Sequence, residues 1–148
     1  MENIQIRMAT LDDIESIAKI EQECFSMPWS YNAIEESMQK DYAYFVVAVF
    51  DSEIVGYIGM YKSFDEGDIT NVAIKTLYRR KGIANRLLNY IFDICKNIGV
   101  ERILLEVRES NAGAIALYEN NGFENIGLRK NFYERPVENA LILKKELS

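Results

Sequence analysis

The stretch YRRKGIA at residues 78–84 decides how the rest of the sequence is interpreted. It lies between a run that predicts a strand over residues 68–74 and a segment, 83–98, in which apolar residues recur at helical spacing. The amino end of a helix presents unpaired backbone N–H groups and a partial positive charge, which suit a phosphate group. Gly82 would let the backbone approach such a ligand closely. The pattern therefore predicts either an anion-binding turn or an ordinary solvated basic turn.

The charge of this turn contrasts with that of the whole chain. Arg79, Arg80 and Lys81 are consecutive cations, whereas the 148 residues carry a formal net charge of −6. Such a turn would attract a pyrophosphate or a 3′-phosphate, and Ala84 leaves the next helical turn uncrowded. The turn lacks the three spaced glycines of a dinucleotide-binding fingerprint and the Gly-Lys-Ser/Thr end of a P-loop. Because an acidic surface opposes nucleic-acid binding, we expect no nucleic-acid partner.

Length and composition predict a single domain over residues 1–148. The chain is 49% hydrophobic and 27% charged, which is enough apolar material for a core. No apolar run reaches the roughly 18 residues that a membrane span requires, and the first residues lack the pattern of a secretory signal. We therefore expect a soluble cytoplasmic protein without a membrane partner, either a monomer or a weak homo-oligomer.

Strand and helix patterns alternate along the chain. Strands are expected over 5–7, 44–50, 54–64, 68–74, 102–107, 123–132 and 138–144. Helices are expected from the Thr10 cap to Phe25 and over 31–40, 83–98 and 111–121. This order predicts an α/β fold with a mixed, mainly antiparallel sheet of about seven strands, flanked by about four helices and containing a central strand–helix–strand crossover.

Histidine is absent from the chain, which excludes Ser-His and Cys-His nucleophile systems and the usual zinc sites. We expect no metal. Cys24 and Cys95 both fall in segments of helical periodicity, so we expect them to be buried, reduced thiols without a catalytic role.

Two side chains could carry proton transfer. Glu106 interrupts the apolar run 103–107, where burial would raise its pKa toward neutrality and make it a general base. Alternatively, Glu106 faces solvent or pairs with Arg79 or Arg108. Tyr118 lies in the apolar helix that follows, where it is either a core residue or a phenol that protonates a departing thiolate.

Two motifs resemble the GNAT acetyltransferase superfamily. Residues 79–84 are similar to its Arg/Gln-x-x-Gly-x-Gly/Ala signature, and residues 111–123 resemble its second cofactor-side helix. The resemblance implies the GNAT fold and acetyl-CoA as co-substrate, with the pyrophosphate held by the backbone of the basic turn. The residues implied in cofactor binding are Val72, Ala73, Ile74, Arg79, Arg80, Lys81, Gly82, Ile83, Ala84, Asn111 and Tyr118.

Further stretches resemble the ribosomal-protein-alanine N-acetyltransferases within that superfamily. These are LEVRESN at 105–111, FSMPWS at 25–30 and RKNFY at 129–133. The resemblance implies direct acetyl transfer to a protein N-terminus, with Glu106 as general base, Tyr118 as general acid and a backbone N–H near residues 71–73 holding the oxyanion. The residues implied in acceptor binding are Pro28, Trp29, Ser30, Asn71, Arg108 and Tyr133.

Some choices stay open at this level. Trp29 is either a core plug or a direct acceptor contact. The usual Tyr-Tyr pair of the family reads Phe132-Tyr133, and the usual Glu-Asp-Ala reads Glu138-Asn139-Ala140, which puts in doubt how a peptide is held. The favoured acceptor is the N-terminal alanine of a small-subunit ribosomal protein. The alternatives are a small amine, a lysine side chain, or a non-catalytic acyl-CoA-binding module.

Overall fold

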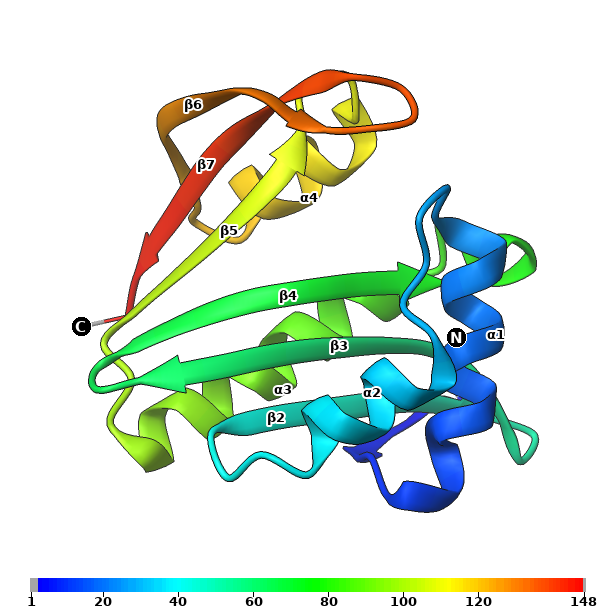
Figure 1. Cartoon of the computed structure of the whole chain (residues 1–148). Helices are drawn as coiled ribbons and strands as arrows, with labels where there is room; N and C mark the ends of the chain where they lie inside the picture. Colours follow the sequence, from blue (N-terminus) through cyan, green and yellow to red (C-terminus); the bar gives the residue numbers. More distant parts are fainter. Residues whose placement is uncertain (1–2, 148) are drawn as a thin grey trace.

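The computed structural model describes residues 3–147, in which seven strands and four α-helices are joined by short loops and two 3-10 turns (Figure 1). The strands are β1 (Gln5–Met8), β2 (Ala43–Phe50), β3 (Glu53–Ser63), β4 (Glu66–Ile74), β5 (Arg102–Arg108), β6 (Glu124–Tyr133) and β7 (Glu138–Glu146). The helices are α1 (Ile14–Cys24), α2 (Tyr31–Met38), α3 (Ile83–Ile98) and α4 (Ala112–Asn120), with 3-10 turns η1 (Leu11–Asp13) and η2 (Thr76–Tyr78). The predicted α/β class and the numbers of strands and helices are confirmed.

One seven-stranded sheet organises these elements, in the order β1-β2-β3-β4-β5-β7-β6. All neighbouring strands are antiparallel except β4 and β5, which are linked through α3 as the predicted crossover. The parallel pairing covers only residues 66–68 of β4 and 102–104 of β5. Beyond that register the two strands part toward their carboxyl ends, and β5 and β7 turn away from β4 (Figure 1). This divergence leaves the ends of β4 and β5 free to line a site.

Helices cover the two faces of the sheet and enclose two apolar clusters. Helix α3 packs behind β2, β3 and β4, and its Leu87, Leu88 and Ile91 are fully buried there (Figure 1). Helices α1 and α2 lie on the opposite face, where Ile17 of α1 and Tyr57 of β3 belong to the second cluster (Figure 1). Burying apolar side chains on both faces is the main stabilising term for such a layered sheet.

Helix α3 begins and ends where the sequence predicts. Gly82 precedes its first turn with φ of 79° and Gly99 follows its last turn with φ of 81°, both in the left-handed region. Glycine adopts this region without the steric cost that a Cβ atom imposes. The two glycines therefore set the ends of the helix that underlies the site.

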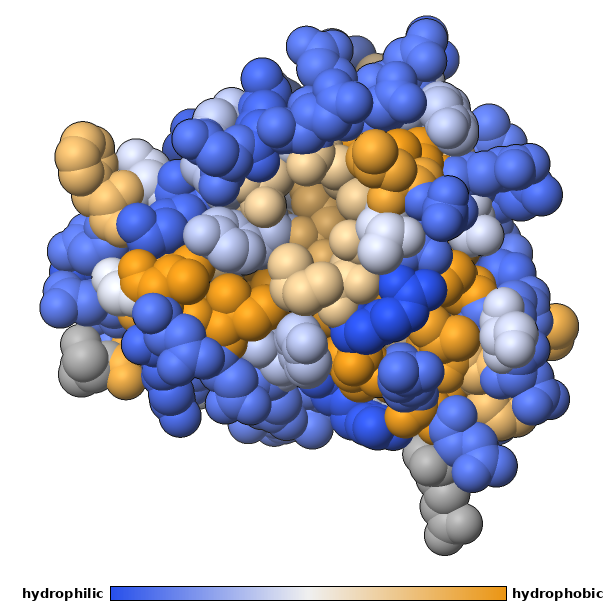
Figure 2. Space-filling model, turned by 90° about the horizontal axis from the view of Figure 1, so that it is seen from below, coloured by the Kyte–Doolittle hydropathy of each residue, from blue (hydrophilic) through white to orange (hydrophobic). Residues whose placement is uncertain are grey.

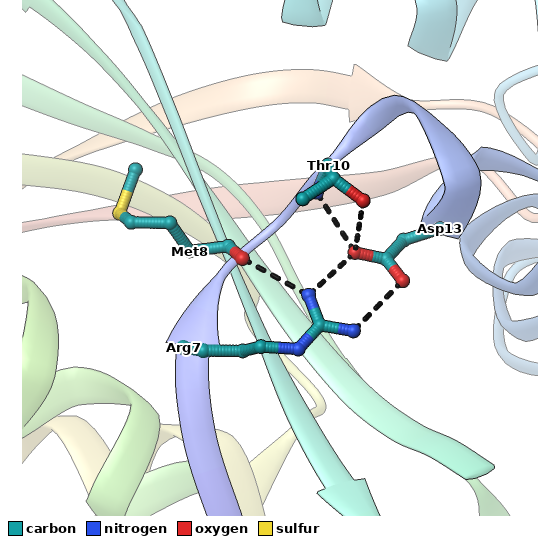
Figure 3. Close-up of polar contacts among 4 residues, drawn as sticks. All are labelled: Arg7, Met8, Thr10 and Asp13. Atoms are coloured by element: carbon teal, nitrogen blue, oxygen red, sulfur yellow. Dashed lines mark hydrogen bonds and ion pairs between the residues drawn. The ribbon is translucent and has the colours of Figure 1, made fainter. Parts of the chain in front are cut away.

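A polar junction joins β1 to η1 (Figure 3). The Arg7 guanidinium donates to both carboxylate oxygens of Asp13, at 2.7 and 3.0 Å, and the backbone N–H of Thr10 donates to Asp13 Oδ2 at 2.8 Å. Asp13 is buried, and these bonds hold the pKa of its carboxyl below the ordinary value, with the Arg7 hydrogen bond as the largest cause. The predicted cap at Thr10 thus begins the 3-10 turn, and α1 follows it.

The two cysteines differ in exposure. Cys95 belongs to α3 and is buried as predicted, and burial raises the pKa of its thiol to about 11. The expectation of burial is wrong for Cys24, which ends α1 and is only partly buried because the chain turns away from the core there.

The surface is mixed in character. On the face seen from below, hydrophilic residues surround apolar patches (Figure 2). Among the helices of residues 3–147, none combines the length and the hydropathy needed to cross a membrane.

Candidate active site

A cavity of about 540 Å³ lies beside the carboxyl end of β4. Its walls come from that strand, the basic turn, the first turn of α3, the end of α1 and α4. The lining residues that the sequence predicted are Val72, Ala73, Ile74, Arg79, Arg80, Gly82, Ile83, Ala84, Asn111 and Tyr118. The lining residues that it missed are Cys24, Phe25, Tyr78, Asn85, Gly113, Ala114 and Leu117. Lys81 belongs to the same turn and is exposed, but it does not line the cavity.

The basic turn forms one end of this cavity. A Cβ atom added to Gly82 would meet no protein atom within 4 Å, so the space above its backbone is open. Arg80 also adopts positive φ, at 62°, which bends the chain sharply into α3. Arg79 is tied back to the strand, because its Nε donates to the carbonyl oxygen of Ile74 at 3.2 Å. The turn therefore presents helix-end N–H groups and cationic side chains to an open space, which suits a bound phosphate.

Strand β4 is irregular where it borders the cavity. The pairing with β3 shifts between Gly59 and Met60, so that Gly59 pairs with Asn71 whereas Met60 pairs with Ile69. The register thus passes over Thr70 as an extra residue, which defines a β-bulge. Two buried side-chain oxygens at this bulge, Thr70 Oγ1 and Asn71 Oδ1, have no hydrogen-bond partner within the described residues. Because buried polar groups are normally paired, such a pair of exceptions marks the bulge as a functional candidate.

Helix α4 brings Tyr118 to the same cavity. Asn111 caps the helix, its side-chain oxygen accepting from the backbone N–H of Ala114 at 3.1 Å. The Tyr118 ring packs edge-on against Phe123, and only 7% of the residue is exposed. Burial raises the pKa of the Tyr118 phenol above its ordinary value. The hydroxyl therefore stays protonated at neutral pH and is available as a proton donor.

The sequence left open whether Glu106 is buried, faces solvent or is paired with an arginine. Its side chain is 34% exposed, so the structure favours the solvent-facing alternative over burial. In β5 the buried positions are Ile103, Leu105 and Val107, and Glu106 faces away from them. Its Oε1 lies 3.4 Å from Nε of Arg129 on β6, rather than beside Arg79 or Arg108.

Arg108 organises the loop between β6 and β7. Its guanidinium donates to the carbonyl oxygens of Glu134 and Pro136, at 3.1 and 3.0 Å, and to Glu138 Oε1 at 3.2 Å. It also lies 4.4 Å from the centre of the Tyr133 ring. Burial, together with the negative charges of Glu106 and Glu138, raises the pKa of Tyr133 to about 12, although the charge of Arg108 opposes the shift. Tyr133 is thus a protonated phenol close to Glu106.

The predicted acceptor loop joins α1 to α2. Ser30 caps α2 by accepting from the backbone N–H of Ala33 at 3.1 Å, and Pro28 is exposed. Trp29 is partly buried against the second apolar cluster, which favours the core-plug interpretation for part of its ring. Its backbone N–H donates to Glu21 Oε1 at 2.9 Å.

Sequence reasoning missed Glu21. This carboxylate on α1 is 1% exposed and also accepts from the Tyr57 hydroxyl and from Nδ2 of Asn71. A signal was present, because Glu21 follows Ile14 by seven residues and Ile17 by four, on the stripe that an amphipathic helix buries.

Comparison with known proteins agrees with this geometry. The model of the Acetyltransferase (GNAT) family matches residues 14–123, and the chain belongs to that family. Its relatives include a *Bacillus subtilis* (strain 168) protein named as a candidate [ribosomal protein bS18]-alanine N-acetyltransferase, 35% identical over 93% of this chain and 92% of that one. The [ribosomal protein bS18]-alanine N-acetyltransferase of *Escherichia coli* (strain K12) is 31% identical over 92% of this chain and 93% of its own length.

A solved structure points to the same group. The crystal structure of the ribosomal-protein-S18-alanine N-acetyltransferase from *Escherichia coli* superposes with a TM-score of 0.92 at 29% identity, covering 98% of this chain and 94% of that one. The predicted resemblance to the ribosomal-protein-alanine N-acetyltransferases is therefore confirmed at the level of sequence and fold.

Proposed function

We propose that this protein is an acetyl-CoA-dependent Nα-acetyltransferase that modifies the N-terminal alanine of a small-subunit ribosomal protein, the counterpart of bS18. The observation that carries the proposal is the cavity that runs from the left-handed turn at Gly82 to the buried Tyr118. It occurs in a chain whose relatives over nearly their full length are named for that activity.

The cavity fits acetyl-CoA as co-substrate, which supplies the acetyl group as a thioester. The open space above Gly82 suits a pyrophosphate, with Arg79 and Arg80 contributing positive charge. The apolar wall of Val72, Ile74 and Leu117 suits the less polar arm that leads to the thioester. No group of three or more cysteine, aspartate or glutamate side chains within residues 3–147 is arranged to hold a metal ion.

Two side chains of the protein, Glu106 and Tyr118, would each carry out one of the two proton transfers. Glu106 is accessible, and as a carboxylate it would take a proton from the acceptor's α-ammonium, directly or through water. An α-amine has a pKa of about 7.7–8.0, so a modest base suffices. Tyr118 would donate its proton to the departing thiolate, a role for which its raised pKa keeps it in the protonated form.

A backbone N–H at the β4 bulge would hold the oxyanion of the attacked carbonyl. The bulge frees main-chain groups near Asn71 from the regular pairing with β3, at the point where β4 has already parted from β5. The acceptor would then enter between the 28–30 loop and residues 132–133 at the end of β6.

The two departures from the family pattern flank the turn between β6 and β7, with Phe132 in β6 and Asn139 in β7. Asn139 Oδ1 accepts from the backbone N–H of Asn131, at 3.0 Å, and Asn131 has φ of 53°. Asn139 thus stabilises a left-handed bend that presents Phe132, which packs edge-on against Tyr133. We infer that these residues shape the acceptor groove by packing, in place of the missing hydroxyl and carboxylate.

The test is acetyl transfer to short peptides, with CoA release as the readout. The panel is a peptide copying the alanine-initiated ribosomal N-terminus, a peptide with a blocked N-terminus and one lysine, and spermidine. Strong preference for the alanine peptide is the expected result. Transfer to spermidine or lysine alone would overturn the N-terminal specificity, and acetyl-CoA binding without any transfer would favour a non-catalytic module.

A further inference from the structure

Glu21 is a buried carboxylate at which three separate parts of the chain meet. Its Oε1 accepts from the backbone N–H of Trp29 at 2.9 Å. Its Oε2 accepts from the hydroxyl of Tyr57 at 2.5 Å and from Nδ2 of Asn71 at 3.0 Å. The donors thus belong to the 28–30 loop, to β3 and to β4.

No cation compensates this carboxylate directly, since none of the ion pairs among residues 3–147 includes Glu21. A carboxylate that is 1% exposed is costly to bury without an opposite charge, and here its three hydrogen bonds take the place of a cation. A glutamine or a leucine of similar volume would fill the same space without burying a charge. Packing alone therefore does not explain why a glutamate occupies position 21.

The bond to Asn71 determines how the side chain at the β4 bulge is oriented. Because Nδ2 donates to Glu21, Oδ1 points the other way, and it is one of the two buried oxygens without a partner. A glutamine at position 21 would present an amide N–H₂ as well as an oxygen, so Asn71 could rotate its amide by half a turn. The carboxylate accepts hydrogen bonds and donates none, and so it permits only one orientation.

The bond to Trp29 determines the position of the acceptor loop. The loop between α1 and α2 contains Pro28, which has no backbone N–H to donate, so the Trp29 N–H is the first main-chain donor after it. Glu21 joins this donor to Asn71 through the two oxygens of one carboxylate. Glu21 therefore fixes the position of the 28–30 loop relative to the β4 bulge.

We propose that Glu21 is a positioning residue for the acceptor amine, acting through the 28–30 loop and Asn71. This inference rests on the proposed function and adds a specific role to its acceptor side. The buried negative charge also favours a cationic acceptor, the α-ammonium form, as it approaches the carboxyl end of β4. Glu21 does not line the cavity assigned to acetyl-CoA, so its effect should fall on the acceptor and not on the cofactor.

The test compares Glu21→Gln with Tyr57→Phe. The second substitution removes one hydrogen bond from the same carboxylate but leaves the bonds to Trp29 and Asn71 in place. Both variants lose a buried hydrogen bond, so both should be less stable. We expect the KM for the acceptor peptide to rise about tenfold or more in Glu21→Gln, as for loss of a hydrogen bond to a charged group, and to stay within about twofold in Tyr57→Phe. The dissociation constant of acetyl-CoA should change little in either.

A double substitution tests whether Glu21 acts through Asn71. If Glu21 acts partly through Asn71, the effects of Glu21→Gln and Asn71→Ala on acceptor KM should be less than multiplicative when combined. An unchanged acceptor KM in Glu21→Gln would overturn the proposal. The proposal would also fail if the acceptor KM rose in both Glu21→Gln and Tyr57→Phe in proportion to the loss of stability of each variant.

A spectroscopic readout separates this proposal from the proposed function. The Asn71 side-chain amide signals, assigned by their loss in Asn71→Ala, should shift upfield in the proton dimension in Glu21→Gln and move less in Tyr57→Phe. If the wild type acetylates another amine of the panel, the KM comparison is made with that amine. If it acetylates none, the proposed function fails, and the amide signals alone decide whether Glu21 orients Asn71; unchanged signals would refute it.

Discussion

Replacing Gly82 by alanine should weaken acetyl-CoA binding far more than it weakens the fold. Gly82 stands at the start of α3 with φ of 79°, and a Cβ added there would point into open space beside the cavity. Gly99 offers a matched control at the other end of the same helix, with φ of 81° and equally open surroundings, but it does not line the cavity.

The two substitutions should have the same conformational cost. An alanine in the left-handed region is less favourable by about 1–2 kcal/mol. The lower entropy of its unfolded chain offsets about 0.4–1 kcal/mol of that. A net loss of about 1 kcal/mol lowers the Tm of a domain of this size by about 4 °C. Neither methyl group would clash with protein atoms, so no further steric cost arises.

Binding should respond only at Gly82. A methyl group above the turn would keep a phosphate away from the backbone N–H groups. Losing one hydrogen bond to a charged group costs about 1.5–3 kcal/mol. That loss corresponds to a dissociation constant larger by roughly 10- to 150-fold. We expect Gly99→Ala to bind acetyl-CoA like the wild type.

Calorimetric titration with acetyl-CoA and thermal unfolding of the free proteins measure the two effects separately. Equal affinities in Gly82→Ala and wild type would refute the assignment of the basic turn to the pyrophosphate. Equal loss of affinity in both alanine variants would mean that the binding change comes from helix α3 as a whole and not from the turn.

Three further predictions concern named groups. Glu106→Gln should bind acetyl-CoA normally and lose most of its turnover at pH 7, measured by CoA release; wild-type turnover would remove Glu106 from the role of base. Tyr118→Phe should slow the chemical step in single-turnover experiments with little change in cofactor affinity, whereas a change in affinity alone would make Tyr118 a packing residue. Because Arg7 lowers the folded-state pKa of Asp13, the pair should stabilise the fold above the unfolded pKa of about 3.9, and this contribution should be lost as the pH falls through the folded-state pKa. Asp13→Asn should therefore lower stability by about 2 kcal/mol at pH 7 in denaturant unfolding, and this loss should shrink as the pH falls below the unfolded pKa of about 3.9; a loss that does not change with pH would contradict the pair's role.

Local features of the chain were predictable from sequence. The helix from Ile83 to Ile98 and its flanking glycines follow from apolar spacing and from the conformational freedom of glycine, both of which act within a few residues. The strand–helix–strand crossover follows from the order of these patterns and from the rarity of other connections. Most of the residues that line the cavity were named from the resemblance to the GNAT superfamily, whose motifs cover the turn and helix that follow β4 in the chain.

The exposure of single side chains was less predictable. The run 103–107 has a single charged residue, and the pattern did not decide whether Glu106 is buried or faces solvent. In β5 the alternate residues Ile103, Leu105 and Val107 face the core. Leu104 lies on the other face, and because it is also apolar the sequence does not show the alternation of apolar and polar residues that marks a half-exposed strand. Cys24 carries the helical periodicity of α1, but α1 ends at that residue and leaves the thiol at the cavity wall.

The sequence alone thus determined the class of fold, the helix that carries the basic turn and the family to which the chain belongs. The tertiary structure decided which side chains meet. Glu21 reaches donors that follow it by 8, 36 and 50 residues, because α1 packs across β3 and β4. Glu106 meets Arg129 because both side chains reach across β7 on one face of the sheet, where Glu106 pairs with Ile142 and Arg129 pairs with Ala140. Patterns of three to seven residues report the local periodicity of a helix or a strand, whereas contacts across such separations depend on how the sheet is ordered and where its strands part.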